Sequence, residues 1–213
     1  GLTNGILWHL LRLITSIKDY LIILFKVLYR NGRPIQIVNF ITSRCNLRCN
    51  HCFYKETLDA ADPGEIKIPI INEYTKNFGS VLWYALGGGE PFIRSDLYKL
   101  YETVETNCRP KVFTIPTNGW YKERIFLSTL RMLQFSKGKR TIIIQFSLDG
   151  NKEMHDQIRG EKSHEKALES LEILKNLQTI YSQLHFSIIT VVTNENRDIY
   201  PKLIDDLVKF ETN

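Results

Sequence analysis

The chain has 213 residues, of which 43% are hydrophobic and 24% are charged. This length suits one sizeable domain. The proportions of hydrophobic and charged residues are those of a globular protein, and they exclude a disordered, collagen-like or multi-span membrane protein. Four cysteines are too few for a secreted fold of this size that is cross-linked by disulfides, and no export signal is evident. We therefore expect a protein of the reducing cytoplasm.

The net charge of +5 is concentrated at the N-terminus. Residues 1–35 contain five basic residues and one acidic residue, whereas the remaining residues are nearly neutral, with 23 basic and 22 acidic side chains. A basic isoelectric point that comes from one segment gives little support to nucleic-acid binding. We therefore expect no nucleic-acid partner.

Residues 6–30 are very apolar but are interrupted by charges. The charged residues within this run are Arg12, Lys18, Asp19, Lys26 and Arg30. They leave no charge-free run near the ~20 residues that a membrane span needs. The polar residues gather on one side of a helix, so residues 1–34 are predicted to form a separate basic amphipathic segment. Such a helix packs on its own domain or on another part of the chain, or it contacts a membrane surface or a partner protein.

Strand-like and helix-like patterns alternate from residue 35 to the end of the chain. We predict strands over residues 35–42, 81–86, 111–116, 141–148 and 184–192, and helices over 70–78, 95–106 with Ser95 as N-cap, 121–135, 165–181 and 199–210. The run TIIIQFSL at 141–148 lacks polar alternation, as expected for a strand covered on both faces. Residues 35–213 are therefore predicted to form an α/β domain with a parallel sheet, as a β/α barrel or partial barrel.

Unusual sequence features follow four of the predicted strands. They are Cys45 after the first strand, residues 87–91 after the second, residues 117–119 after the third and residues 147–150 after the fourth. The carboxyl ends of parallel strands meet at one edge, where ligands bind in β/α folds. We therefore expect these features to form one site.

Three of the four cysteines lie in the sequence TSRCNLRCNHCFY, with the spacing Cys45-x3-Cys49-x2-Cys52. Three thiolates in a compact loop suit a [4Fe–4S] cluster that keeps one iron open to a ligand. Structural zinc is the rival, although no second ligand pair follows and His51 lies too close in sequence to chelate the same ion well. Three unrelated free cysteines are the remaining alternative. Cys108, well separated from the others, is expected to be a buried thiol.

This loop and the later sequence Gly88-Gly89-Glu90-Pro91 resemble the radical S-adenosylmethionine (SAM) enzymes, and the resemblance covers about residues 35–200. It implies a partial (β/α)6-type TIM barrel and an oxidoreductase whose [4Fe–4S] cluster is bound by Cys45, Cys49 and Cys52. SAM would bind the open iron. Its reductive cleavage would give methionine and a 5′-deoxyadenosyl radical that abstracts hydrogen from the substrate.

The resemblance also implies contacts to SAM. Gly88 and Gly89 would let the backbone approach the ligand, and Glu90 would accept a hydrogen bond from the methionyl amine. Ser147 and Arg159 have the separation found in the branch of sulfatase maturases and peptide maturases, and the arginine suits a carboxylate. The other expected contacts are Thr117, Asn118, Asp149, His51 and Phe53.

Some of these residues have structural alternatives. Asp149 would contact the ribose or cap the following turn, and Arg159 would bind SAM or form a surface salt bridge. Phe53 would pack against the cluster, against adenine or in the core. His51 would lie near the adenine. A structural hydrogen bond is a better expectation for His155 than a role as general base.

Relatives in this branch usually add a sixth strand and a cysteine-rich extension of the SPASM or twitch type, whereas here no cysteine follows Cys108. We expect that the chain is truncated before the sixth strand, rather than being a reduced member with an open barrel. The missing region would include any auxiliary clusters.

The resemblance implies a peptide or protein side chain as substrate and a reductant such as flavodoxin or ferredoxin. One alternative is a radical SAM enzyme that acts on a lipid or a small-molecule cofactor precursor. An iron–sulfur protein that transfers electrons or senses without cleaving SAM is the alternative of another class. The amphipathic N-terminus would allow a position at the membrane periphery.

Overall fold

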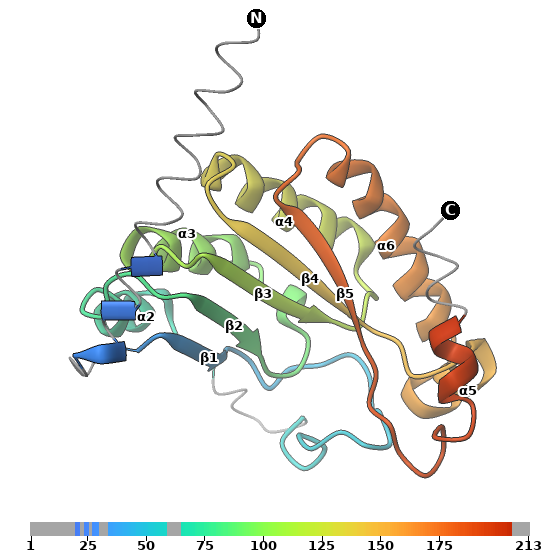
Figure 1. The fold of residues 1–213 in the computed structure, drawn as a ribbon. Helices are drawn as coiled ribbons and strands as arrows, with labels where there is room; N and C mark the ends of the chain where they lie inside the picture. Colours follow the sequence, from blue (N-terminus) through green and yellow to red (C-terminus); the bar gives the residue numbers. More distant parts are fainter. Residues whose placement is uncertain (1–19, 22–23, 26, 30–33, 59–64, 206–213) are drawn as a thin grey trace, which may run out of the picture.

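The computed structural model describes residues 20–21, 24–25, 27–29, 34–58 and 65–205. Its sheet consists of β1 (Gln36–Phe40), β2 (Trp83–Gly87), β3 (Val112–Thr117), β4 (Thr141–Ser147) and β5 (Leu184–Ile189). The strands lie in the order β1-β2-β3-β4-β5, and every neighbouring pair is parallel (Figure 1). The predicted strands are confirmed, and their carboxyl ends share one edge of the sheet.

The helical elements are α2 (Ile68–Thr75), the 3-10 helix η1 (Pro91–Ile93), α3 (Leu97–Cys108), α4 (Lys122–Ser136), α5 (Lys152–Arg159) and α6 (Ser163–Gln178). The predicted N-cap of α3 is wrong, because the helix begins at Leu97 with Asp96 as its N-cap. The carboxylate of Asp96 makes no capping bond, since it accepts two hydrogen bonds from Arg94 at 2.9 Å each. Of the last predicted helix, residues 200–205 are helical, and the rest lies outside the described residues.

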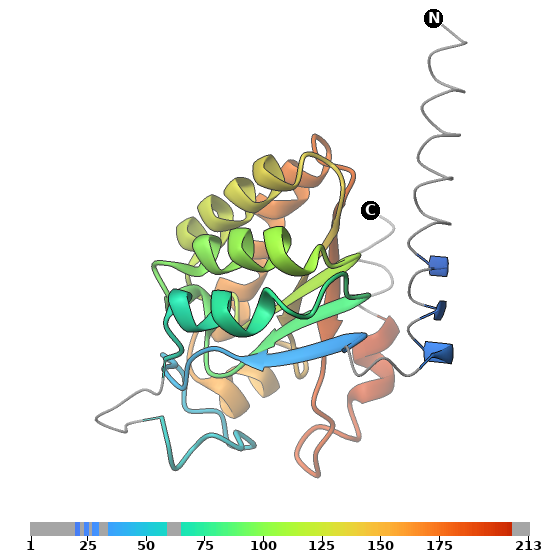
Figure 2. The same ribbon diagram turned by 90° about the vertical axis from the view of Figure 1, so that its left-hand side faces the viewer.

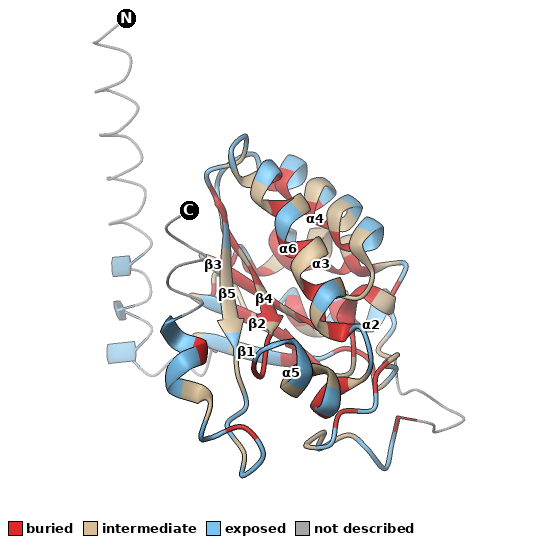
Figure 3. Cartoon of the chain, turned by 90° about the vertical axis from the view of Figure 1, so that its right-hand side faces the viewer, coloured by how far each residue is buried: buried red, intermediate tan, exposed pale blue. Residues whose placement is uncertain are grey.

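Helices α2, α3 and α4 lie on one side of the sheet (Figure 2). The space between the two layers is filled by large, fully buried side chains such as Tyr84, Phe113 and Met132, and the outward faces of the helices are exposed (Figure 3). This burial holds the strands in place and leaves the carboxyl edge free to carry the loops.

The prediction that both faces of 141–148 are covered is wrong among the described residues. Ile142, Ile144 and Phe146 face the helices and are fully buried, whereas the side chains between them are half-buried. On β1, Val38 and Phe40 are 54% and 48% exposed. The half-buried side chains of β4, of which Ile143 is apolar and the others are polar, belong to the face that would line the interior of a closed barrel. We call this face of the sheet the open face.

The predicted amphipathic helix over residues 6–30 lies mostly outside the described residues. Its described members are exposed, including Leu28 and Tyr29 at 67% each, and the rings of Phe25 and Tyr29 stack with centroids 4.1 Å apart. Within the part of the chain that the structure describes, no helix is both long enough and apolar enough to cross a membrane. The boundary at residue 34 stays a prediction.

Candidate functional site

The three clustered cysteines lie in the loop that follows β1, at the carboxyl edge of the sheet. All are free thiols, with Cys49 buried and Cys45 and Cys52 half-buried. The pKa of Cys45 is raised to about 11, mainly by burial and to a smaller extent by the nearby groups of Glu90, Cys49 and Cys52. Burial also raises the pKa of Cys49. A buried thiol with a raised pKa becomes a thiolate readily only when a positive metal centre binds it.

The glycine-rich turn after β2 packs against the beginning of this loop. The backbone N–H groups of Gly89 and Glu90 donate to the carbonyl oxygens of Thr42 and Arg44 at 2.8 and 2.9 Å. A Cβ on Gly88, whose φ is +123°, would overlap the Thr42 carbonyl oxygen, and one on Gly89 would overlap that of Arg44. The close backbone approach that we predicted for a ligand is therefore made, in this structure, to the chain that leads into Cys45.

Glu90 connects the ends of β2 and β3. Its side chain is 1% exposed, and one oxygen accepts hydrogen bonds from the Phe92 N–H and the Thr117 hydroxyl at 3.1 and 2.9 Å. The other oxygen accepts from the Asn118 N–H at 2.7 Å. Burial raises the Glu90 pKa to about 7, although these hydrogen bonds act in the opposite direction. The carboxylate predicted to bind an ammonium group is thus already bonded to its own chain.

Asn118 brings the turn after β3 onto the cysteine loop. Its side-chain amide donates to Asn46 Oδ1 at 3.0 Å and to Cys45 Sγ at 3.8 Å. Its own Oδ1 accepts from the Trp120 N–H at 3.0 Å. Asn118 therefore contacts a predicted cluster ligand directly.

Asp149 and Arg159 form a buried ion pair at the ends of β4 and α5. The Asp149 side chain is fully buried, and its Oδ2 accepts from Arg159 Nε at 2.6 Å while Oδ1 accepts from the Val191 N–H at 2.9 Å. Arg159, 8% exposed, also donates from Nη1 to Cys49 Sγ at 3.9 Å. The surface salt bridge considered for Arg159 is wrong, because its ion pair is buried. The capping role considered for Asp149 is also wrong, because its oxygens accept from Arg159 and Val191 and Asn151 caps α5.

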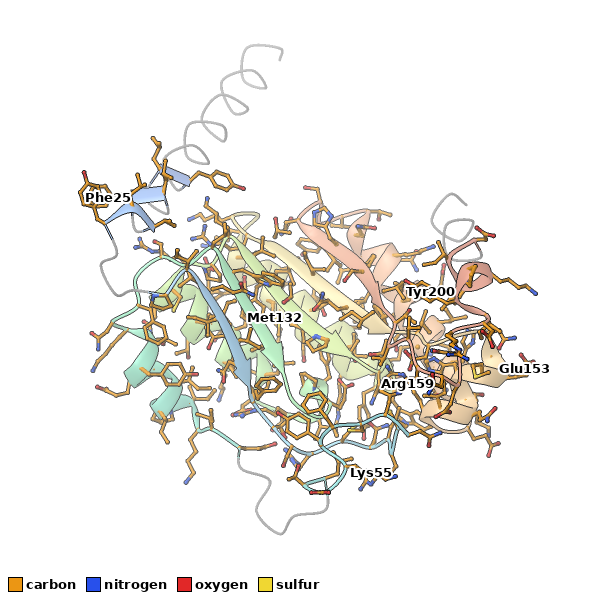
Figure 4. All side chains as sticks on the ribbon, turned by 60° about the horizontal axis from the view of Figure 1, so that its bottom comes forward. Phe25, Lys55, Met132, Glu153, Arg159 and Tyr200 are labelled. Atoms are coloured by element: carbon orange, nitrogen blue, oxygen red, sulfur yellow. The ribbon has the colours of Figure 1, made fainter. Side chains whose placement is uncertain are left out.

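Arg159 and the cysteine loop lie at the same edge of the sheet, as Figure 4 shows with Arg159 and Lys55 labelled. His155, on α5, is fully buried, and its Nδ1 accepts from the Asp149 N–H at 3.1 Å. Burial lowers the His155 pKa to about 4, and the charge of Arg159 contributes. The His155 ring is therefore neutral, and it holds the backbone of Asp149 in position.

Three further predicted contacts lie at this edge. Phe53 is 81% exposed and contacts the rings of Phe40 and Tyr54, so the core-packing alternative is wrong. His51 has its Nε2 3.8 Å from Asp149 Oδ2, and burial lowers its pKa. Ser147 is half-buried at the last position of β4.

The sequence analysis missed two polar residues at this edge. Asn46, between Cys45 and Cys49, accepts the amide of Asn118. Asn196, 1% exposed, donates to the carbonyl oxygens of Asp149 and Val191 at 2.8 and 2.9 Å. Asn196 follows β5, so the rule that predicted the other sites, polar residues after parallel strands, also applies to it.

Comparisons with known proteins agree with this arrangement. A family model described as the Radical SAM superfamily matches residues 39–207. The chain belongs to this superfamily. It therefore belongs with enzymes that use a [4Fe–4S] cluster and SAM, and the matched residues include the cysteine loop and all five strand ends.

Two curated radical SAM relatives are similar in sequence. The mycofactocin maturase MftC of Mycolicibacterium smegmatis is 32% identical over 170 residues, 78% of this chain and 39% of that protein. The pre-heme d1 synthase of Dinoroseobacter shibae is 31% identical over 180 residues, 81% of this chain and 40% of that protein. The chain thus spans about two fifths of the length of each relative.

A solved structure supports the fold. Native anSMEcpe with bound AdoMet and Cp18Cys peptide aligns with 84% of this chain and 48% of that chain, at 22% identity and a TM-score of 0.63. This likeness agrees with the expected partial TIM-type barrel of parallel strands.

The residues of the cysteine loop fit the cluster of the radical SAM superfamily. Among the described residues, no three His, Cys, Asp or Glu side chains are placed to share a single metal ion. A cluster binds each thiolate to a different iron, so its ligands stand farther apart than those of one ion. Asn46 Nδ2 and His51 Nδ1 are buried in this loop without a hydrogen-bond partner, as expected of donors that face a bound group.

Substitution of Gly89 tests the contact between the glycine-rich turn and the cysteine loop. We expect Gly89→Ala to lower the free energy of unfolding by about 2 kcal/mol or more, because the new Cβ overlaps the Arg44 carbonyl. Gly138→Ala is the matched control. Gly138 has φ +74° with nothing near a Cβ, so only about 1 kcal/mol of backbone strain is expected. Equal losses in chemical denaturation of the two variants would contradict the contact.

Proposed function

We propose that this chain carries the SAM-cleaving site of a radical SAM enzyme that modifies a peptide or protein side chain. The observation that carries the proposal is the convergence of the Cys45-x3-Cys49-x2-Cys52 loop with polar groups from the ends of β2, β3 and β4. In the proposal, Cys45, Cys49 and Cys52 bind a [4Fe–4S] cluster, which supplies the electron that splits SAM into methionine and a hydrogen-abstracting 5′-deoxyadenosyl radical.

The predicted SAM contacts divide into two groups. We assign Ser147, His51 and Phe53 to direct contact with SAM. Among the described residues, the Ser147 hydroxyl makes no hydrogen bond, His51 Nδ1 has no partner although Nε2 lies near Asp149, and the Phe53 ring is exposed. The second group makes hydrogen bonds within the chain itself, and it consists of Glu90, Thr117, Asn118 and Asp149. We assign them to positioning the cysteine loop and the SAM pocket. Gly88 and Gly89 support the same loop through their close packing against Thr42 and Arg44.

Arg159 belongs partly to both groups. Its Nε is paired with Asp149 and its Nη1 donates to Cys49 Sγ. A guanidinium has five N–H donors in a planar fork, so it can hold this pairing and still offer a donor to the SAM carboxylate. A reductant such as flavodoxin or ferredoxin would supply the electron.

Two features support a peptide substrate. MftC is named a maturase, and the similar anSMEcpe structure was solved with a peptide. The open face also carries exposed apolar side chains beside the cysteine loop, since Phe40 is 48% exposed and contacts Phe53 of the loop, which is 81% exposed. A surface of this kind suits the side chains of an extended segment.

A small-molecule cofactor precursor is the second candidate substrate. The similarity to the pre-heme d1 synthase, at 31% identity, is nearly equal to the similarity to MftC. Both candidates use the same SAM site, so they differ only in what reaches the open face.

Replacing a cysteine of the loop tests the SAM-cleaving site. We expect Cys49→Ser to abolish formation of 5′-deoxyadenosine from SAM under dithionite, because a ligand of the cluster is lost. Cys108→Ser is the matched control. Cys108 is fully buried against Thr75, outside the loop, and we expect this variant to keep the activity. Continued 5′-deoxyadenosine formation by Cys49→Ser, measured by chromatography, would contradict the proposal.

The substrate class can be tested through the hydrogen that is abstracted. Extracts of the producing organism grown in D₂O are separated into a peptide and protein fraction and a small-molecule fraction, and each is added with SAM and dithionite. We expect deuterium in 5′-deoxyadenosine with the first fraction, measured by mass spectrometry, and none with the Cys49→Ser variant. Deuterium transfer from the small-molecule fraction alone would support the second candidate instead.

A further inference from the structure

Two of the three loop cysteines accept a hydrogen bond from a side chain on a different element. Asn118 Nδ2, after β3, lies 3.8 Å from Cys45 Sγ. Arg159 Nη1, at the end of α5, lies 3.9 Å from Cys49 Sγ. Cys52 Sγ accepts no such bond from the described residues. The environment of the three sulfurs is therefore unequal.

The amide of Asn118 is fixed in orientation. Its Oδ1 accepts from the Trp120 N–H and its Nδ2 donates to Asn46 Oδ1, both at 3.0 Å. A flipped amide would face the Trp120 N–H with its own NH₂ group and lose both bonds. Because the residue is 7% exposed, water cannot replace them freely. The NH₂ group is thus held against Cys45.

The guanidinium of Arg159 is fixed by its ion pair. Asp149 is fully buried, and its Oδ2 accepts from Arg159 Nε at 2.6 Å. Asp149 is itself held by the Val191 N–H at 2.9 Å. A cationic donor that is 8% exposed is weakly screened, so its effect on the Cys49 sulfur is larger than that of a surface arginine.

Donors of this kind act on the two redox states of a cluster unequally. The sulfurs carry more negative charge in the reduced state, so N–H donors and nearby cations stabilise that state more than the oxidised one. The number of hydrogen bonds to the sulfurs is one of the factors that set the reduction potential of iron–sulfur clusters.

We propose that Asn118 and Arg159 are positioning residues that raise the reduction potential of the cluster through N–H···S hydrogen bonds to Cys45 and Cys49. This inference rests on the proposed cluster ligands and deepens the proposed function. It assigns Asn118 to the cluster rather than to SAM. The consequence is a cluster that a reductant of the flavodoxin or ferredoxin class reduces more readily than it would without these donors.

The test is a redox titration of the reconstituted protein without SAM or substrate, followed by electron paramagnetic resonance. Asn118→Leu removes the donor to Cys45, and we expect a midpoint potential more negative than that of the wild type, with four irons per chain retained. Asn50→Leu is the matched control, because this loop asparagine is exposed and its amide points to Glu195 Oε2 at 3.2 Å. Its midpoint potential should equal that of the wild type.

Arg159→Gln tests the second donor, and a shift to more negative potential is again expected. Arg44→Gln is the matched control. It removes the same charge from an exposed arginine of the cysteine loop, which pairs with Glu65, and it should change the midpoint potential little. An unchanged potential in both Asn118→Leu and Arg159→Gln, with iron retained, would overturn the inference.

A second variant separates tuning from folding. Asn118→Asp keeps an acceptor for the Trp120 N–H but has no donor for Cys45, so its potential should also be more negative. Loss of iron from both Asn118 variants would overturn the inference in favour of a purely structural role. A wild-type protein that bound no cluster would instead contradict the proposed function.

Discussion

The site depends on buried hydrogen bonds that join the cysteine loop to the ends of the neighbouring strands. The loop has little regular structure of its own, so its geometry comes from these bonds. Gly89 and Glu90 bond to its first residues, Asn118 bonds to Cys45 and Arg159 bonds to Cys49. The helix-backed sheet fixes the strand ends, and the strand ends fix the sulfurs.

These bonds involve groups that are costly to bury alone. Glu90 and Asp149 are 1% and 0% exposed, and a carboxylate without partners at such positions would cost several kcal/mol. Each has at least two donors, and Asp149 also has the charge of Arg159. Burial against fixed partners gives these carboxylates one geometry, which suits residues that position others.

Much of this fold could be predicted from the sequence, because the apolar runs and the turn residues have distinct periods. The cysteine spacing likewise predicted the loop. The partners of the buried carboxylates could not be predicted, since Glu90 and Thr117 lie 27 residues apart and no local pattern joins them. The exposure of Phe53 and the half-buried face of β4 depend on what covers the open face.

Helix α5 was also missed, although its signals are present. Asn151 is a favourable N-cap, Glu153 lies in the first turn and Arg159 in the last. The helix is short, and the sequence analysis predicted no element between residues 148 and 165. The structure shows that this segment is helical and that its last residue, Arg159, contacts Cys49 of the cysteine loop.

The central claim is that three thiolates serve a four-iron cluster and leave one iron distinct. Mössbauer spectroscopy of protein reconstituted anaerobically with ⁵⁷Fe tests it directly. The account predicts the spectrum of a [4Fe–4S] cluster in which one iron of the four changes its isomer shift when SAM is added. A protein without a cluster, or a cluster whose four irons all stay unchanged by SAM, would contradict it.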